Sequence, residues 1–133
     1  MRLATQKEKF ALLGPPGDHK RQGICKIPMK LKLSWKLGYN LTQFQCHIML
    51  IPHFLQVYKK MSKLDKSLII ASGMDIWGGC YNYRPIRGTE HQAAPPFSAH
   101  AWGAAIDHDP VRNGLHTKAP KANLSDSRFD PIH

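Results

Sequence analysis

The ten residues 98–107, with the sequence SAHAWGAAID, restrict the fold of this chain more than any other segment. They place His100 and Asp107 seven positions apart, which is too far for one helical turn and unsuited to one face of a strand. The two side chains can therefore converge only if the chain reverses between them. Gly103 permits such a reversal, and the small alanines that follow it leave room for an ion.

The chain also holds the remaining groups that a catalytic zinc ion needs. Its last four residues, 130–133, have the sequence DPIH and so add a second carboxylate and a second imidazole. Mixed nitrogen and oxygen ligands, with one position left open for water, are typical of catalytic zinc sites. The sequence thus predicts a site for one zinc ion.

The pattern S-x-H-x-x-G-x-A-x-D, together with the tripeptide Y-R-P at residues 83–85, resembles the zinc D-alanyl-D-alanine metallopeptidases. This family includes D,D-carboxypeptidases, L-Ala-D-Glu endopeptidases and phage endolysin catalytic domains, which share a hedgehog-like peptidase fold. The likeness is densest over residues 78–109. It implies a hydrolase that degrades peptidoglycan stem peptides by means of metal-activated water.

The resemblance also implies a role for each residue of the site. Three residues would bind the zinc ion: His100, Asp107 and His133. Asp130 would be the general base. Arg84 would bind the substrate carbonyl or a terminal carboxylate, with Arg87 as the alternate.

Two other histidines compete with His133 for the third ligand position. His108 follows Asp107 directly, and adjacent residues of a strand point to opposite faces, which argues against it. His116 lies in a predicted loop and stays open as a ligand.

Three further residues are expected on the substrate side of the site: Tyr83, Ser98 and Trp102. Ser98 is expected to orient the His100 loop by hydrogen bonding, and no other feature supports a serine nucleophile. Trp102 either walls the pocket or belongs to the core.

The net charge of +10 lies entirely in the first half of the chain. Residues 1–66 carry 13 Lys and Arg against 3 Asp and Glu, whereas residues 67–133 carry 6 of each. A basic surface beside the site would attract an anionic cell-wall polymer, unless it serves only for solvation. Nucleic acid is disfavoured as a partner, because the chain has no recognisable nucleic-acid-binding motif.

The three cysteines have no C-x-x-C spacing, so we expect buried thiols and neither a disulfide framework nor a cysteine zinc site. No apolar run is long enough for a signal peptide or a membrane span. We therefore expect synthesis in the cytoplasm and action on the cell wall after delivery by another factor, as in a phage or prophage setting.

The length of 133 residues predicts one domain. Residues 1–23 are basic and broken by the run GPPG at 14–17, so we predict an irregular leader there, and the resemblance implies a zinc-peptidase-like domain over residues 24–133. We expect an α+β fold, with a small antiparallel sheet, helices on one face and the zinc site at the sheet edge. Strands are predicted at four places: residues 24–35, 67–72, 80–84 and 103–108. Residues 73–79 are predicted as a loop. A helix is predicted over residues 43–63, and Pro52 either kinks it or lies in the first turn of a shorter one.

His133 is the last residue of the sequence. Either the domain is truncated there, or the third ligand is held less firmly than in the family. The alternative function is therefore a non-catalytic, metal-poor relative of the same fold that binds the cell wall.

Overall fold

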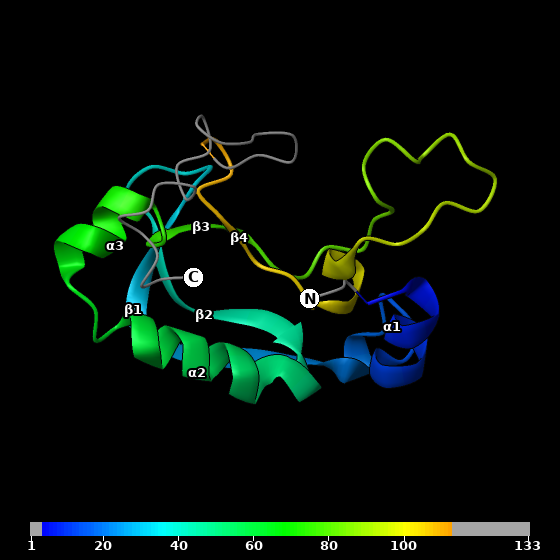
Figure 1. Ribbon diagram of the computed structural model, residues 1–133, viewed down its shortest axis with the longest axis horizontal. Coiled ribbons are helices and arrows are strands. Elements are labelled where there is room, and N and C mark those ends of the chain that lie inside the picture. Colours follow the sequence, from blue (N-terminus) through cyan, green and yellow to red (C-terminus); the bar gives the residue numbers. More distant parts are fainter. Residues whose placement is uncertain (1–3, 113–133) are drawn as a thin grey trace.

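A four-stranded sheet and three α-helices form the part of the chain that the structure, a computed structural model, describes, residues 4–112 (Figure 1). The α-helices and strands follow in this order: α1 (Gln6–Leu13), β1 (Gln22–Leu33), β2 (Asn40–His47), α2 (Ile51–Met61), α3 (Lys66–Ser72), β3 (Ile76–Gly79) and β4 (Asp107–His108). Three short 3-10 helices lie between them: η1 (His19–Arg21), η2 (Ile48–Leu50) and η3 (Ala99–Trp102). The expected α+β class is confirmed. No helix within residues 4–112 is long and apolar enough to cross a membrane.

The strand order is β2-β1-β3-β4, and the sheet is mixed. The β1–β2 and β3–β4 pairs are antiparallel, but β1 and β3 are parallel. The sheet is thus not wholly antiparallel as predicted. The reason is the connection between β2 and β3, which passes through two helices and so can return the chain to the sheet beside β1 in the parallel direction.

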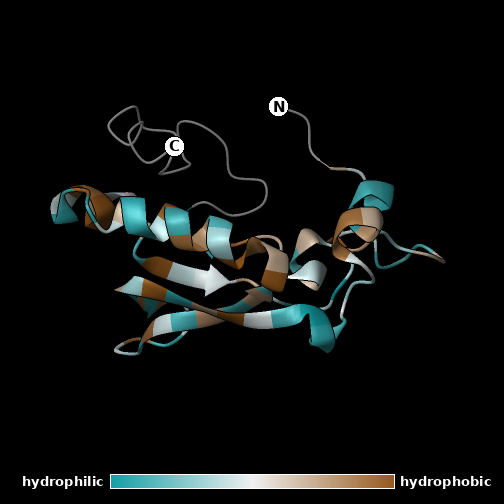
Figure 2. Cartoon of the chain, turned by 90° about the horizontal axis from the view of Figure 1, so that it is seen from below, coloured by the Kyte–Doolittle hydropathy of each residue, from teal (hydrophilic) through white to brown (hydrophobic). Residues whose placement is uncertain are grey.

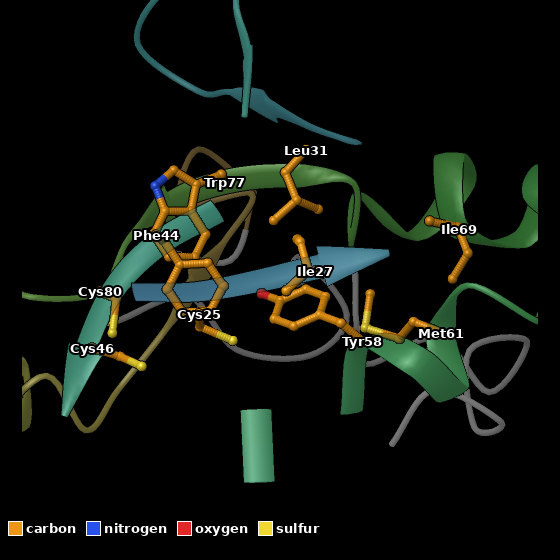
Figure 3. Close-up of a cluster of buried hydrophobic side chains, with 10 residues drawn as sticks. All are labelled: Cys25, Ile27, Leu31, Phe44, Cys46, Tyr58, Met61, Ile69, Trp77 and Cys80. Carbon is orange, nitrogen blue, oxygen red and sulfur yellow. The ribbon is translucent and has the colours of Figure 1, made fainter. Parts of the chain in front are cut away.

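The hydrophobic core lies between the sheet and the helices α2 and α3 (Figure 3). Its buried members come from β1, β2, β3, these two helices and the residue that follows β3. They include all three cysteines as free thiols: Cys25, Ile27, Leu31, Phe44, Cys46, Tyr58, Met61, Ile69, Trp77 and Cys80. The Tyr58 hydroxyl lies 2.8 Å from His108 Nε2 in this layer. His108 therefore belongs to the core face of the sheet, and its neighbour Asp107 to the opposite, outer face.

The N-terminal half keeps the predicted strand but not the irregular leader. Strand β1 alternates buried and exposed side chains, as its sequence predicts. The leader contains α1, whose N-terminus has a capping box between Thr5 and Glu8. The side-chain amide of Gln6 both donates to and accepts from the backbone of Phe97, at 2.9 and 3.1 Å, which ties α1 to the segment before η3.

The helix predicted over residues 43–63 is shorter. Its first part belongs to β2, because Phe44 and Cys46 are buried and alternate with exposed residues. Pro52 lies in the first turn of α2, so the second alternative for this proline is confirmed.

Residues 67–72 form helix α3 and not the predicted strand. A short apolar run is compatible with either structure, and here the helix caps decide. Asp65 accepts a hydrogen bond from the Ser67 backbone N–H at 2.9 Å, and Gly73 ends the helix with a left-handed φ of +78°.

Three predictions near the site also change. The loop predicted over residues 73–79 contains β3. Residues 80–84 lie outside the strands of the sheet, and Cys80 is at a bend. The strand predicted over residues 103–108 is reduced to β4, because Gly103 ends the 3-10 helix η3 and the chain must first leave that turn.

Candidate metal centre

His100 lies in a tight turn that its own neighbours fix. Ser98 caps η3, and its hydroxyl accepts a hydrogen bond from the His100 backbone N–H at 3.3 Å. Gly103 ends η3 with a φ of +69°, and a Cβ there would lie 2.7 Å from the backbone N of His47. The reversal predicted between His100 and Asp107 is present, and it requires glycine for its conformation and for its close contact with β2.

The imidazole of His100 is buried and oriented by one hydrogen bond. Its Nδ1 lies 2.7 Å from the carbonyl oxygen of Cys80. A carbonyl oxygen only accepts, so Nδ1 carries the proton and donates it. In the neutral ring, Nε2 is then left with a free lone pair.

That lone pair faces the carboxylate of Asp107. His100 Nε2 and Asp107 Oδ2 are 3.3 Å apart, and the Asp107 side chain is 48% exposed. Two electron-pair donors at this distance repel each other unless a cation, either a proton or a metal ion, lies against both. With the proton on Nε2, the hydrogen bond from His100 holds the pKa of the Asp107 carboxyl below its ordinary value against the opposing effect of burial, and the charges of Arg84 and Arg87 add to this.

The separation also suits zinc. Two ligand atoms about 2.1 Å from one tetrahedral ion are roughly 3.4 Å apart. Within residues 4–112, however, no group of three or more His, Cys, Asp or Glu side chains could hold a metal ion. His108 faces the core and is not the third ligand. The other two ligand candidates, His133 and His116, and the expected general base Asp130 lie outside the described residues.

A cavity of about 240 Å³ opens beside the pair. Besides His100 and Asp107, its lining includes the backbone of β3 and the polar or aromatic residues Trp35, Tyr81, Asn82, Arg84 and Arg87. A peptide carbonyl or carboxylate could therefore meet both cationic groups and the histidine–aspartate pair in one space.

Arg84 is held at this cavity with unused hydrogen-bonding capacity. Its Nη1 donates to the carbonyl oxygen of Pro85 at 3.2 Å. Its Nε is buried and meets no acceptor among residues 4–112. The Arg84 carbonyl accepts from the Ser98 backbone N–H at 3.1 Å, so the arginine and the His100 turn are joined directly.

Two residues predicted on the substrate side lie elsewhere. Trp102 is 1% exposed and donates through Nε1 to the Gly14 carbonyl at 2.8 Å, so the core alternative holds for it. Tyr83 is exposed, but its ring stacks on Phe97 at a centroid distance of 5.4 Å. Neither lines the cavity: the Trp102 ring packs against Phe10 of α1 and Phe97, and the Tyr83 ring lies against Phe97 and Gly17.

Besides Tyr81 and Asn82, which also line the cavity, sequence reasoning missed Trp35 and Gly78 as residues of the site. Trp35, from the hairpin between β1 and β2, lines the cavity. Gly78 faces Asp107, since a Cβ at Gly78 would lie 2.9 Å from the Asp107 Cβ. Both depend on the pairing of strands distant in sequence, and no local pattern signals that pairing.

Comparison of the chain with protein-family models, with curated proteins and with solved structures finds no match. The resemblance to zinc D-alanyl-D-alanine metallopeptidases therefore rests on the motif residues of this chain.

Proposed function

We propose that this protein is a zinc-dependent peptidase that hydrolyses peptidoglycan stem peptides, as a D,D-carboxypeptidase or an L-Ala-D-Glu endopeptidase. One observation carries the proposal: the hydrogen bond from Nδ1 to the Cys80 carbonyl directs Nε2 of His100 at Asp107 Oδ2, 3.3 Å away. The substrate class is supported by the motif around residues 83–107 alone.

In the proposed mechanism, His100 and Asp107 would hold the ion, and His133 would add the third ligand. When bound, the ion would lower the pKa of a water molecule and polarise the scissile carbonyl. Asp130 would take a proton from the attacking water and return it to the leaving amine. The parts assigned to Asp130 and His133 rest on the sequence.

The described residues supply the electrostatic part of the reaction. Arg84 lies at the cavity with a buried Nε that meets no acceptor in the described part of the chain. Its guanidinium would stabilise the negative charge that develops on the carbonyl oxygen. Arg87 also lines the cavity, and its exposed guanidinium would attract a substrate carboxylate.

The test is the zinc content of the purified chain, measured by mass spectrometry alongside hydrolysis of an isolated stem peptide. We expect one equivalent of zinc and measurable hydrolysis in the wild type, and loss of both in His100→Ala and Asp107→Asn. His53→Ala is the matched control, because His53 is an exposed histidine of α2.

A wild type without zinc, or zinc content equal in all four proteins, would contradict the proposed centre. Binding to cell walls without zinc and without hydrolysis would support the non-catalytic alternative.

A further inference from the structure

The outer face of the sheet carries a row of lysines on β1. Exposed side chains alternate with buried ones along this strand, and three of the exposed ones are Lys26, Lys30 and Lys32, here called the β1 lysine row. Figure 2 shows the helices on one side of the strands. The lysine row belongs to the other side, because the residues that alternate with it pack in the core.

The charge of this surface is one-sided. Residues 22–64 contain seven lysines and no Asp or Glu. Lys32 is tied to Asp75 by an ion pair at 3.4 Å. Lys26 and Lys30 form no ion pair with any residue of the described part. Their charges are therefore available to an external anion.

Polar groups that suit a hydroxylated polymer lie beside the row. Lys26 pairs with Gln43 across the β1–β2 ladder, and Lys32 pairs with Asn40. Residues of a strand are about 3.3 Å apart along its axis, so the two unpaired lysines, Lys26 and Lys30, present charges at most roughly 13 Å apart. Such a surface matches an extended chain that carries phosphates and hydroxyl groups in alternation.

The lysine row and the metal centre share one face of the sheet. Asp107 is on the outer face of β4, because its neighbour His108 faces the core. Only β3 separates β4 from β1, and β1 pairs with β3 at Lys32 and Leu33. Strands lie about 4.8 Å apart, so the Lys32 end of the row is about 10 Å from β4 across the sheet, and Lys30 and Lys26 follow at increasing distance along β1. A polymer bound along β1 would pass beside the cavity.

We propose that the β1 lysine row binds a polyol-phosphate polymer of the cell wall and so holds the peptidase on the wall that contains its substrate. The inference rests on the proposed function, to which it adds a specific partner and a specific surface. Nucleic acid also carries phosphates, but surfaces for single-stranded nucleic acid combine a basic groove with aromatic rings. The exposed aromatic rings nearest to the row, Trp35 and Tyr39, belong to the hairpin turn, and none of the exposed side chains on β1 and β2 themselves is aromatic.

The test is co-sedimentation of the full chain with purified cell-wall sacculi, at increasing salt. One set of sacculi retains its polyol-phosphate polymers, and the other has been stripped of them by acid. The variant carries Lys26→Gln and Lys30→Gln, which spares the ion pair of Lys32. The control carries Lys59→Gln and Lys63→Gln, which removes two exposed charges at the end of α2.

We expect the β1 variant to bind phosphate-bearing sacculi about tenfold more weakly, with a shallower dependence on salt, and the control to bind like the wild type. Stripped sacculi should bind all proteins equally weakly. Equal losses in variant and control, undiminished binding to stripped sacculi, or tighter binding to single-stranded DNA would each overturn the proposal.

The His100→Ala variant separates this proposal from the proposed function. It should sediment like the wild type, because polymer binding needs no metal. Suppose that the protein binds phosphate-bearing sacculi through the lysine row but holds no zinc. That result would refute the proposed peptidase function and support the proposed polymer-binding surface.

Discussion

His100 donates its Nδ1 proton to the carbonyl oxygen of Cys80 at 2.7 Å, and this one bond determines which nitrogen faces Asp107. The Cys80 carbonyl is a backbone group, so no substitution at position 80 removes it. The orientation of the imidazole thus depends on the path of the chain between β3 and residue 84. It depends much less on the identity of the side chains there.

Gly78→Ala is expected to weaken zinc binding by at least about tenfold. The new Cβ would lie 2.9 Å from the Asp107 Cβ and 3.0 Å from Pro110 Cδ, so the aspartate must move away from His100. Competition with a chromophoric chelator measures the affinity. Gly38→Ala is the control: its φ of +84° makes alanine unfavourable, but nothing lies within 4 Å of the added Cβ. Equal zinc affinity in both variants would contradict the prediction.

Arg84→Gln is expected to lower kcat/KM for a stem peptide by about 100-fold while zinc content stays at the wild-type level. Loss of one donor to a developing oxyanion typically costs about that factor. Arg87→Gln should raise KM and leave kcat nearly unchanged, because Arg87 is exposed and assigned to substrate attraction. If Arg87→Gln lowered kcat/KM by about 100-fold and Arg84→Gln raised only KM, Arg87 would be the residue that stabilises the oxyanion and Arg84 the one that attracts the substrate.

Tyr58→Phe is expected to destabilise the fold by about 1–3 kcal/mol, since it leaves the buried Nε2 of His108 without its hydrogen-bond donor. Urea unfolding measures the change. Zinc content should not change, because the His108 Nδ1 donates to the Ile76 carbonyl at 3.2 Å and the ring faces away from the centre. A loss of zinc in a folded Tyr58→Phe protein would show that His108 takes part in the metal site.

The buried thiols should make the protein less stable at alkaline pH. Burial raises the pKa of Cys46 to about 12, whereas a thiol in the unfolded chain has a pKa of about 8.5. The folded state therefore retains a proton that the unfolded state loses. The stability from this group is complete below pH of about 8.5 and declines above it.

Cys46→Ala removes this contribution and provides the measurement. Between pH 9 and 10, the free energy of unfolding should fall less steeply in the variant, by about 1.4 kcal/mol per pH unit. Parallel slopes for the two proteins would mean that the Cys46 thiol ionises as readily in the folded state as in the unfolded one.

The sequence predicts best where one segment decides its own structure. The alternation along β1 predicts that strand and its lysine-bearing face, and Pro52 marks the first turn of α2. The run from Ser98 to Asp107 predicts the reversal, because Gly103 is the residue that can end η3 in a left-handed conformation.

The prediction of secondary structure and of site residues fails where contacts between distant segments, or the residues that cap a short helix, determine the conformation. The apolar run 67–72 fits a strand equally well until Asp65 and Gly73 cap it as a helix. Gly78 and Trp35 join the site only through the parallel pairing of β1 with β3, which no local periodicity reveals.

The link between Gln6 and Phe97 has a consequence for the order of assembly during synthesis. These two hydrogen bonds span 91 positions, so the helix that braces the His100 turn must wait for most of the chain to leave the ribosome. Closing so long a loop costs entropy before any contact repays it. The β1–β2 hairpin, with its local contacts, can form first, so the surface that carries the lysines should be in place before the His100 turn.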